Sequence, residues 1–125
     1  MPREPIQPAG LATPRPPYSP VVVSGDHVFT AGQVAFDGEG ALVSEDIAGQ
    51  THQVLANVRT CLEAAGCGLA DVVKVTAFLA DLSDFERYNE VYAGYFEAPY
   101  PARTTVQAGL PPGIRVEIEA VARKA

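Results

Sequence analysis

The chain has 125 residues, 47% of them hydrophobic and 19% charged, which is the composition of one folded domain and not of a disordered segment. Its net charge is −6 and it has only nine Lys and Arg residues, so we expect no binding to nucleic acid. The first residues lack an apolar signal core and no apolar run approaches the ~20 residues of a membrane span, so we expect a cytoplasmic protein that binds no membrane.

The first predicted element is an extended arm over residues 1–17. Seven prolines fall within the first 20 residues, and proline excludes both a helix and a central strand. Residues 21–23 and 28–30 follow as two short strands, because a turn containing Gly25 separates two apolar runs.

A helix is predicted over residues 46–65. Its apolar residues recur with the 3.6-residue spacing of a helix that lies on a sheet. Asp46 can cap the first turn and Gly66 can end the last one. Residues 72–80 then alternate as a strand, with Val73, Val75, Ala77 and Leu79 expected on one face.

A second helix is predicted from a capping box at residues 83–86 to about Phe96. The last third reads as two paired strands, 103–108 and 114–123. The order β-β-α-β-α-β-β predicts a single α+β domain over residues 1–125, a mixed sheet with both helices packed on one face. The other face is then either solvated or buried by another subunit.

The last strand pair carries a polar pattern. Arg103 and Thr105 are expected to share a face by the period of two, and so are Glu117 and Glu119 on the next strand. The alternate positions are mostly apolar and are expected to face the helices: Thr104, Val106 and Ala108 on the first strand, and Val116, Ile118, Ala120 and Ala122 on the second. If Thr105 lies opposite Glu117, Arg103 becomes a diagonal neighbour of Glu117, and such a pair could bind a carboxylate and hold a water. The alternative is that these are ordinary solvated charges.

Other candidate residues are ambiguous by themselves. Tyr18 follows stiff prolines and either packs for bulk or lines a pocket, and Asn89 on the second helix is a surface residue or a partner for a neighbouring loop. Cys61 and Cys67 have no further Cys or His at the spacing of a zinc site, and no glycine-rich segment matches a phosphate-binding motif. We therefore expect no metal site and no dinucleotide site.

From Tyr18 to the C-terminus the sequence resembles the Rid (YjgF) family of reactive-intermediate deaminases. The most specific pieces are Pro-Ala-Arg at 101–103 and Val-Glu-Ile-Glu-Ala at 116–120, which occur in the right order and at the right separation. Further matches are residues 17–19, 29–33, 50–57, 64–66, 71–74 and 84–85, with Asn89 and Tyr92.

The resemblance implies a fold like chorismate mutase of the Bacillus type and a homotrimer with its clefts between subunits. Active members of the family hydrolyse imines and enamines such as 2-aminoacrylate to a 2-oxo acid and ammonia, without a metal or an organic cofactor. By position, Arg103 would bind the substrate carboxylate and Glu117 would orient or activate the attacking water. Tyr18 would line the cleft from the neighbouring subunit.

Four further positions would contact the substrate or support the cleft. Gly32 and Ala31 would lie close to the ligand, Asn89 would support the wall, and the backbone at Thr105 would hold the imine nitrogen or the water. Ala31 stands where the family often has serine, and Thr105 stands where it often has cysteine. Because of these two departures, the resemblance does not identify the substrate.

Three functions are therefore weighed. The resemblance favours an imine or enamine deaminase, acting on 2-aminoacrylate-like compounds or on another imine, for example an aminomuconate-like one. A trimeric module that binds small carboxylic acids without turnover is the alternative. A ribonuclease or translation inhibitor, a label that the family also carries, is disfavoured by the net charge of −6.

Overall fold

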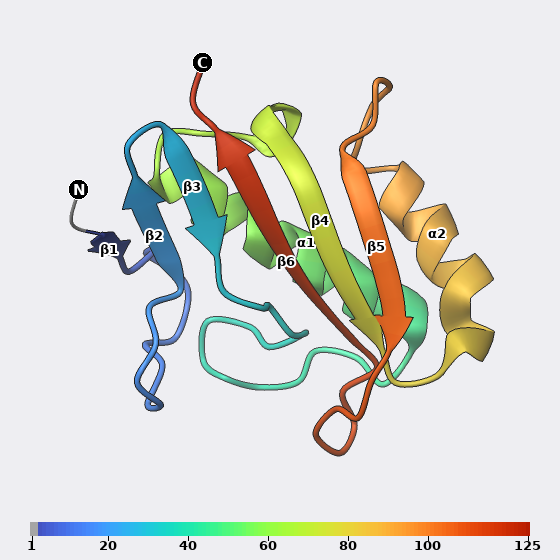
Figure 1. Cartoon of the computed structure of the whole chain (residues 1–125). Helices are drawn as coiled ribbons and strands as arrows, with labels where there is room; N and C mark the ends of the chain where they lie inside the picture. The colour runs from blue at the N-terminus through green and yellow to red at the C-terminus, as the bar shows by residue number, and fades with distance from the viewer. Residues whose placement is uncertain (1–2) are drawn as a thin grey trace.

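The computed structural model describes residues 3–125, which form one sheet with two α-helices (Figure 1). The elements in chain order are β1 (Glu4–Ile6), β2 (Val21–Ser24), β3 (His27–Thr30), α1 (Ile47–Ala64), β4 (Val72–Leu79), α2 (Phe85–Ala93), β5 (Ala102–Gln107) and β6 (Val116–Arg123), with single 3₁₀ turns at Leu69–Asp71 and Leu82–Asp84. No helix within this range is both long and apolar enough to cross a membrane.

The strands form a single sheet in the order β1-β2-β3-β6-β4-β5, and both helices lie on one side of it (Figure 1). The predicted α+β class and its single helical layer are confirmed. One strand was not predicted. The N-terminal arm contributes β1, which pairs antiparallel with β2 at the edge of the sheet. Pro5 is compatible with this position because an edge strand can lack one N–H donor.

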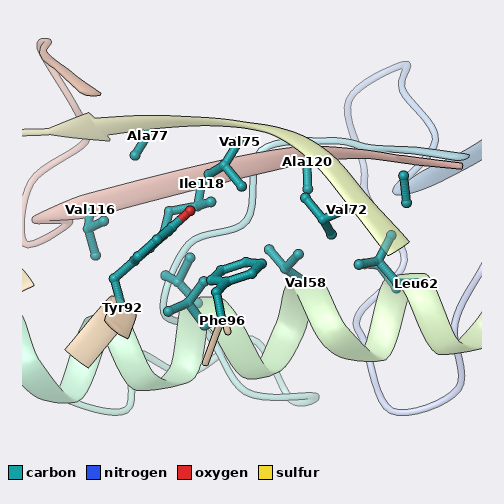
Figure 2. Packing of buried hydrophobic residues seen from close by; sticks show 14 of the residues in the cluster. Val58, Leu62, Val72, Val75, Ala77, Tyr92, Phe96, Val116, Ile118 and Ala120 are labelled. Carbon is teal, nitrogen blue, oxygen red and sulfur yellow. The ribbon is translucent and has the colours of Figure 1, made fainter. Parts of the chain in front are cut away.

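Helix α1 forms where the apolar spacing predicts it. The Asp46 carboxylate accepts a hydrogen bond from the Gly49 N–H at 3.2 Å, and Gly66, with a φ of 83°, follows the last turn in the left-handed conformation. Val58 and Leu62 point from the helix toward the sheet (Figure 2). Burial of this stripe fixes α1 across the middle of the sheet.

The sheet side of the core comes mainly from β4 and β6. Val75 and Ala77 of β4 pack beside Val116 and Ile118 of β6, and all four are fully buried (Figure 2). Val73 was predicted to belong to this set, and that prediction is wrong. A register shift between Val72 and Lys74 turns Val72 inward and leaves Val73 50% exposed.

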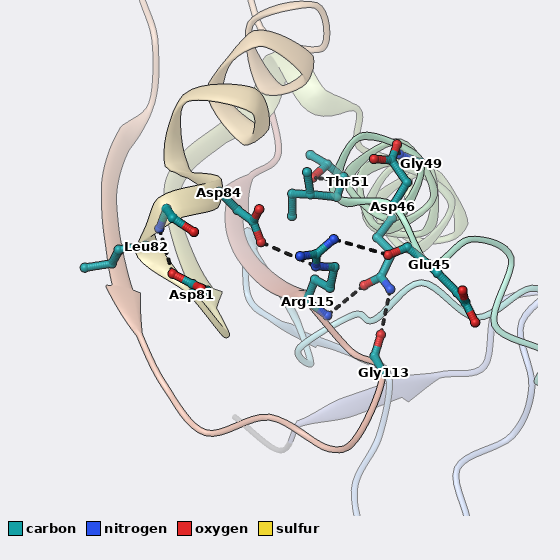
Figure 3. A network of polar contacts seen from close by, with 12 residues as sticks. Glu45, Asp46, Gly49, Thr51, Asp81, Leu82, Asp84, Gly113 and Arg115 are labelled. Carbon is teal, nitrogen blue, oxygen red and sulfur yellow. Dashed lines mark hydrogen bonds and ion pairs between the residues drawn. The ribbon is translucent and has the colours of Figure 1, made fainter.

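The predicted capping box at residues 83–86 is also wrong. Asp81 accepts from the Ser83 N–H at 2.9 Å, so it is the 3₁₀ turn that is capped. Asp84 precedes α2 without capping it, and its Oδ2 lies 3.4 Å from Nε of Arg115 (Figure 3). The helix ends at Ala93 and not near Phe96, although Phe96 remains buried against the core.

Gln50 ties the loop between β5 and β6 to the start of α1. Its buried amide donates to the carbonyl oxygens of Ser44 (3.0 Å) and Gly113 (2.7 Å) and accepts from the Arg115 N–H at 2.8 Å. Figure 3 shows Gly113 and Arg115 beside the start of α1. The Arg115 side chain in turn forms an ion pair with Asp84, just before α2. These contacts fix the point at which the chain enters β6.

The pairing of the last two strands differs from the prediction. β5 pairs in parallel with β4, and β4 lies between β5 and β6. The physical reason is the connection through α2, because a strand, a helix and a second strand in sequence form a crossover whose two strands run parallel. The loop after β5 therefore carries the chain past β4, and no hairpin forms.

Candidate active site

Arg103 of β5 lies against three aromatic rings of α2. Its guanidinium carbon is 4.6 Å from the ring centroid of Tyr92, 5.3 Å from that of Tyr88 and 5.7 Å from that of Phe85. The spacing of these residues along α2 places them on one face of the helix, and each ring attracts the cation through its π electrons. We call Phe85, Tyr88 and Tyr92 the aromatic tray.

The tray holds Arg103 without neutralising it. Within residues 3–125 no carboxylate pairs with Arg103, whereas Arg87, Arg115 and Arg123 each pair with an acidic side chain. Arg103 is half-buried and borders an open pocket of about 380 Å³, lined also by Asn89, Tyr92, Ala93, Tyr100 and Pro101. A half-buried guanidinium beside a pocket has donors available for an anionic ligand.

Tyr88 connects the tray to a second residue of β5. Its hydroxyl lies 3.2 Å from Oγ1 of Thr105, and its side chain is fully buried. Burial raises the pKa of the Tyr88 phenol, while the bond to Thr105 and the charge of Arg103 act in the opposite direction. The phenol therefore remains neutral at physiological pH.

A second group of candidate residues gathers on the other face of the sheet. The Glu117 carboxylate of β6 lies directly against Gly32, so closely that a side chain at position 32 would overlap with it. Burial raises the pKa of Glu117, and the nearby charge of Glu119 raises it further. A carboxylate of this kind is a stronger base than a fully solvated one.

The N-terminal arm forms a pocket next to Gly32. It has a volume of about 400 Å³ and is lined by Tyr18, Gly32, Arg15 and Asn57, among others. Tyr18 is 53% exposed, which favours the pocket-wall alternative over packing for bulk. Ala31 is half-buried, and its N–H donates to the Pro20 carbonyl at 2.8 Å, which fixes the arm beside the pocket.

The predicted pairing of Arg103 with Glu117 is wrong. Arg103 is opposite Val75 in the register and shares its helix-facing side, whereas Glu117 is opposite Phe78 on the open side. The candidate residues thus form two groups on opposite faces of one chain. Arg103, Thr105 and Asn89 belong to the first group. Glu117, Gly32, Ala31 and Tyr18 belong to the second.

Some features of the site cannot be recognised from the sequence pattern alone. The spacing of Phe85, Tyr88 and Tyr92 was visible, but their role under Arg103 depends on which face of β5 meets α2. Arg15 lines the pocket beside Tyr18 and gave no motif that could have identified it. Among residues 3–125 no three His, Cys, Asp or Glu side chains gather as a metal site requires. Burial raises the pKa of Cys61 to about 12, so its thiol is unreactive.

The chain is similar to known proteins both in sequence and in fold. Residues 10–124 match the family described as Endoribonuclease L-PSP. The chain is 48% identical over 115 residues to a RutC family protein of Pyrococcus horikoshii, covering 89% of this chain and 91% of that protein. It is 45% identical over 108 residues to the human 2-iminobutanoate/2-iminopropanoate deaminase, covering 85% and 79%.

A solved structure of similar fold contains a small ligand. The crystal structure of E. coli TdcF with bound serine superposes with a TM-score of 0.91 at 35% identity, covering 98% of this chain and 99% of that one. The fold implied by the resemblance is therefore confirmed. With a match over nearly its whole length, the chain belongs to the Rid/YjgF/L-PSP family.

Proposed function

We propose that this protein hydrolyses small 2-imino acids and their enamine tautomers, such as 2-aminoacrylate, to 2-oxo acids and ammonia. The observation that carries the proposal is Arg103 on its aromatic tray, with no acidic partner among residues 3–125. The 45% identity to a relative named for deamination of 2-iminobutanoate and 2-iminopropanoate supports the same reaction.

Arg103 binds the carboxylate of the substrate. A guanidinium can donate two parallel hydrogen bonds to the two carboxylate oxygens, which fixes both the position and the plane of the acid. The tray holds the guanidinium within 5.7 Å of three ring centroids, and no carboxylate among residues 3–125 pairs with it, so its N–H donors are available for the ligand. Asn89 and Tyr100 form the walls of this pocket.

The reaction requires a second copy of the chain. A substrate held by Arg103 lies on the helix-facing side of the sheet, and Glu117 of the same chain lies on the other side. A neighbouring copy therefore supplies Glu117, Gly32 and Tyr18. The open face supports such an association, because Phe29 and Val73 are 41% and 50% exposed on it. We propose a homotrimer, in which each copy gives Arg103 to one cleft and Glu117 to another.

In the cleft, Glu117 accepts a proton from a water molecule while the water oxygen bonds to C2 of the imine. The C=N electron pair moves to nitrogen, which takes that proton from Glu117 and becomes an amino group. In the resulting tetrahedral intermediate the proton of the new hydroxyl passes through Glu117 to the amino group, the C–N bond breaks and ammonia leaves, while the hydroxyl oxygen forms the C=O bond. Orientation of the water and general-base help from a carboxylate contribute most of the rate, the latter about 10²–10⁴-fold.

Turnover of an imine generated in the assay tests the proposal. A dehydratase produces 2-aminoacrylate from serine, and the loss of 2-aminoacrylate is followed with and without this protein. Wild type accelerates the loss, and Arg103→Ala lowers kcat/KM roughly 100-fold or more because charged hydrogen bonds to the carboxylate disappear. Arg103→Lys keeps the positive charge but loses the two parallel donors, so its kcat/KM should lie between those of wild type and Arg103→Ala.

Arg87→Ala is the matched control, since Arg87 pairs with Glu90 on the exposed side of α2. Equal rates for wild type and Arg103→Ala would exclude the deaminase proposal. Binding of pyruvate that depends on Arg103, without turnover of any imine, would instead identify a carboxylic-acid binding module. RNA cleavage by highly purified protein that survives Arg103→Ala would identify the ribonuclease activity that the family description names.

A further inference from the structure

Tyr88 is the one tray residue that contacts both β5 side chains of the candidate site. Its ring lies 5.3 Å from the guanidinium carbon of Arg103, and its hydroxyl lies 3.2 Å from Oγ1 of Thr105. Arg103 and Thr105 are two residues apart and therefore share one face of the strand. Because Tyr88 is fully buried, it holds both side chains from a fixed position.

The other two tray residues lack this connection. Phe85 has no hydroxyl, and the Tyr92 hydroxyl points into the core, where no group of residues 3–125 forms a hydrogen bond with it (Figure 2). Burial raises the pKa of Tyr92 to about 12. Among the three tray residues, only Tyr88 has a hydroxyl within hydrogen-bond distance of a β5 side chain.

The chemistry of the two hydroxyls sets the direction of their hydrogen bond. A phenol is more acidic than an alkyl alcohol, so the Tyr88 O–H is the better donor and the Thr105 oxygen is the better acceptor. The neighbouring charge of Arg103 strengthens this donor. With its oxygen accepting from Tyr88, the half-buried Thr105 hydroxyl directs its own proton elsewhere.

We propose that Tyr88 is a positioning residue that makes the Thr105 hydroxyl a hydrogen-bond donor to the group on C2 of the acid held by Arg103. The proposal rests on the carboxylate anchor of the proposed function. A 2-oxo acid carries an oxygen on C2, and a neutral 2-imino acid carries a nitrogen there; both accept a hydrogen bond. An unsubstituted acid has no acceptor at C2, so the Tyr88–Thr105 pair selects 2-oxo and 2-imino acids.

Binding of two probe acids tests this proposal on the assembled protein. Pyruvate has an acceptor on C2 and propanoate has none, while both have the carboxylate that Arg103 binds. Calorimetry gives the two affinities for wild type and each variant. Tyr88→Phe is expected to weaken pyruvate binding about three- to tenfold, the loss of one hydrogen bond, and to leave propanoate binding within about twofold.

Variants at position 105 complete the test. Thr105→Val removes the hydroxyl at constant shape and should have the same selective effect, and the double variant with Tyr88→Phe should be no weaker than either single one. Thr105→Ser keeps the hydroxyl, so unlike Thr105→Val it should bind pyruvate in preference to propanoate as wild type does. Tyr95→Phe is the matched control, because it removes a hydroxyl that bonds to His52 at 3.0 Å, outside the candidate site.

The outcomes separate this proposal from the proposed function. Equal losses for pyruvate and propanoate in Tyr88→Phe would indicate a structural role and overturn the proposal, as would an unchanged ratio or the failure of wild type to bind either acid. A selective loss of pyruvate in a protein that turns over no imine would support the positioning role and refute the deaminase.

Discussion

Arg103 and Glu117 lie on opposite faces of the sheet, on the two strands that flank β4. One chain therefore cannot bring both to the same ligand. In a ring of three copies, however, the Arg103 side of each copy can face the Glu117 side of the next.

Complementation between two inactive variants checks this arrangement. Arg103→Ala and Glu117→Gln carry different affinity tags, are expressed together, and are purified by both tags in turn. Every doubly tagged trimer then has one cleft in three with both residues intact, so about one third of wild-type activity should return. Each variant purified alone is the control. No recovery would mean that the two residues do not act in one shared cleft.

Gly32→Ala should reduce activity while the fold remains. The added methyl group overlaps with the Glu117 carboxylate and must displace it. A displacement of about 1 Å in a catalytic group can cost on the order of 100-fold, so we expect a loss of about this size in kcat/KM. Gly68→Ala is the control, because its Cβ meets no atom within 4 Å. Full activity of Gly32→Ala would mean that the position of Glu117 is unimportant.

Glu119→Gln should extend activity to lower pH. Glu117 acts as a base only in its ionised form, so kcat/KM falls as the pH drops through the pKa of Glu117. Because that pKa is raised, this fall occurs at a pH above the ordinary value of 4.5. Removing the charge of Glu119 removes one cause of that rise, so the pKa of Glu117 falls and the acid limb moves to lower pH.

The measurement is kcat/KM against pH for both proteins on the same imine, with the uncatalysed rate subtracted at each pH. Glu63→Gln, on the exposed side of α1, is the control. An acid limb that moves to higher pH, or does not move, would contradict the assignment of Glu117 as the base.

Gln50→Leu should destabilise the protein far more than the same change at Gln53. Gln50 satisfies two carbonyl oxygens and one N–H through its buried amide, and these groups would lose their partner. We expect a loss of about 3 kcal/mol in the free energy of unfolding. Gln53 makes a single bond to Asn57, so Gln53→Leu should cost about 1 kcal/mol. Urea unfolding at one protein concentration measures both, and equal losses would contradict the role of the Gln50 contacts.

The sequence was most informative where one face of an element is buried. The alternation of Val116, Ile118 and Ala120 predicted the inner face of β6 correctly, and Asp46 and Gly66 marked the ends of α1. The same reasoning was wrong for β5. Thr104 and Val106 were predicted to face the helices, but Arg103 and Thr105 lie opposite the buried Val75 and Ala77, and Val106 is 40% exposed. β5 is an edge strand whose residues are exposed or half-buried on both faces, so its alternation is a weak guide to the face that meets the helices.

The error about Arg103 follows from the same cause. Two strands joined by a short loop usually pair, and nothing in residues 103–123 shows that β4 lies between them. That information is in the crossover through α2, which lies earlier in the chain. The identity of Arg103 as a candidate came from the resemblance, whereas its environment required the structure.

Strand β1 determines where the sheet can grow. It covers β2, whose Val-Val-Val run would otherwise present unpaired N–H and C=O groups at the edge, and Pro5 leaves β1 itself a poor template for a further strand. A chain shortened to begin at Gln7 should form aggregates on storage, visible as increasing light scatter, whereas the full chain stays clear. Residues 4–6 are therefore expected to limit edge-to-edge association of the sheet, a role separate from any chemistry in the cleft.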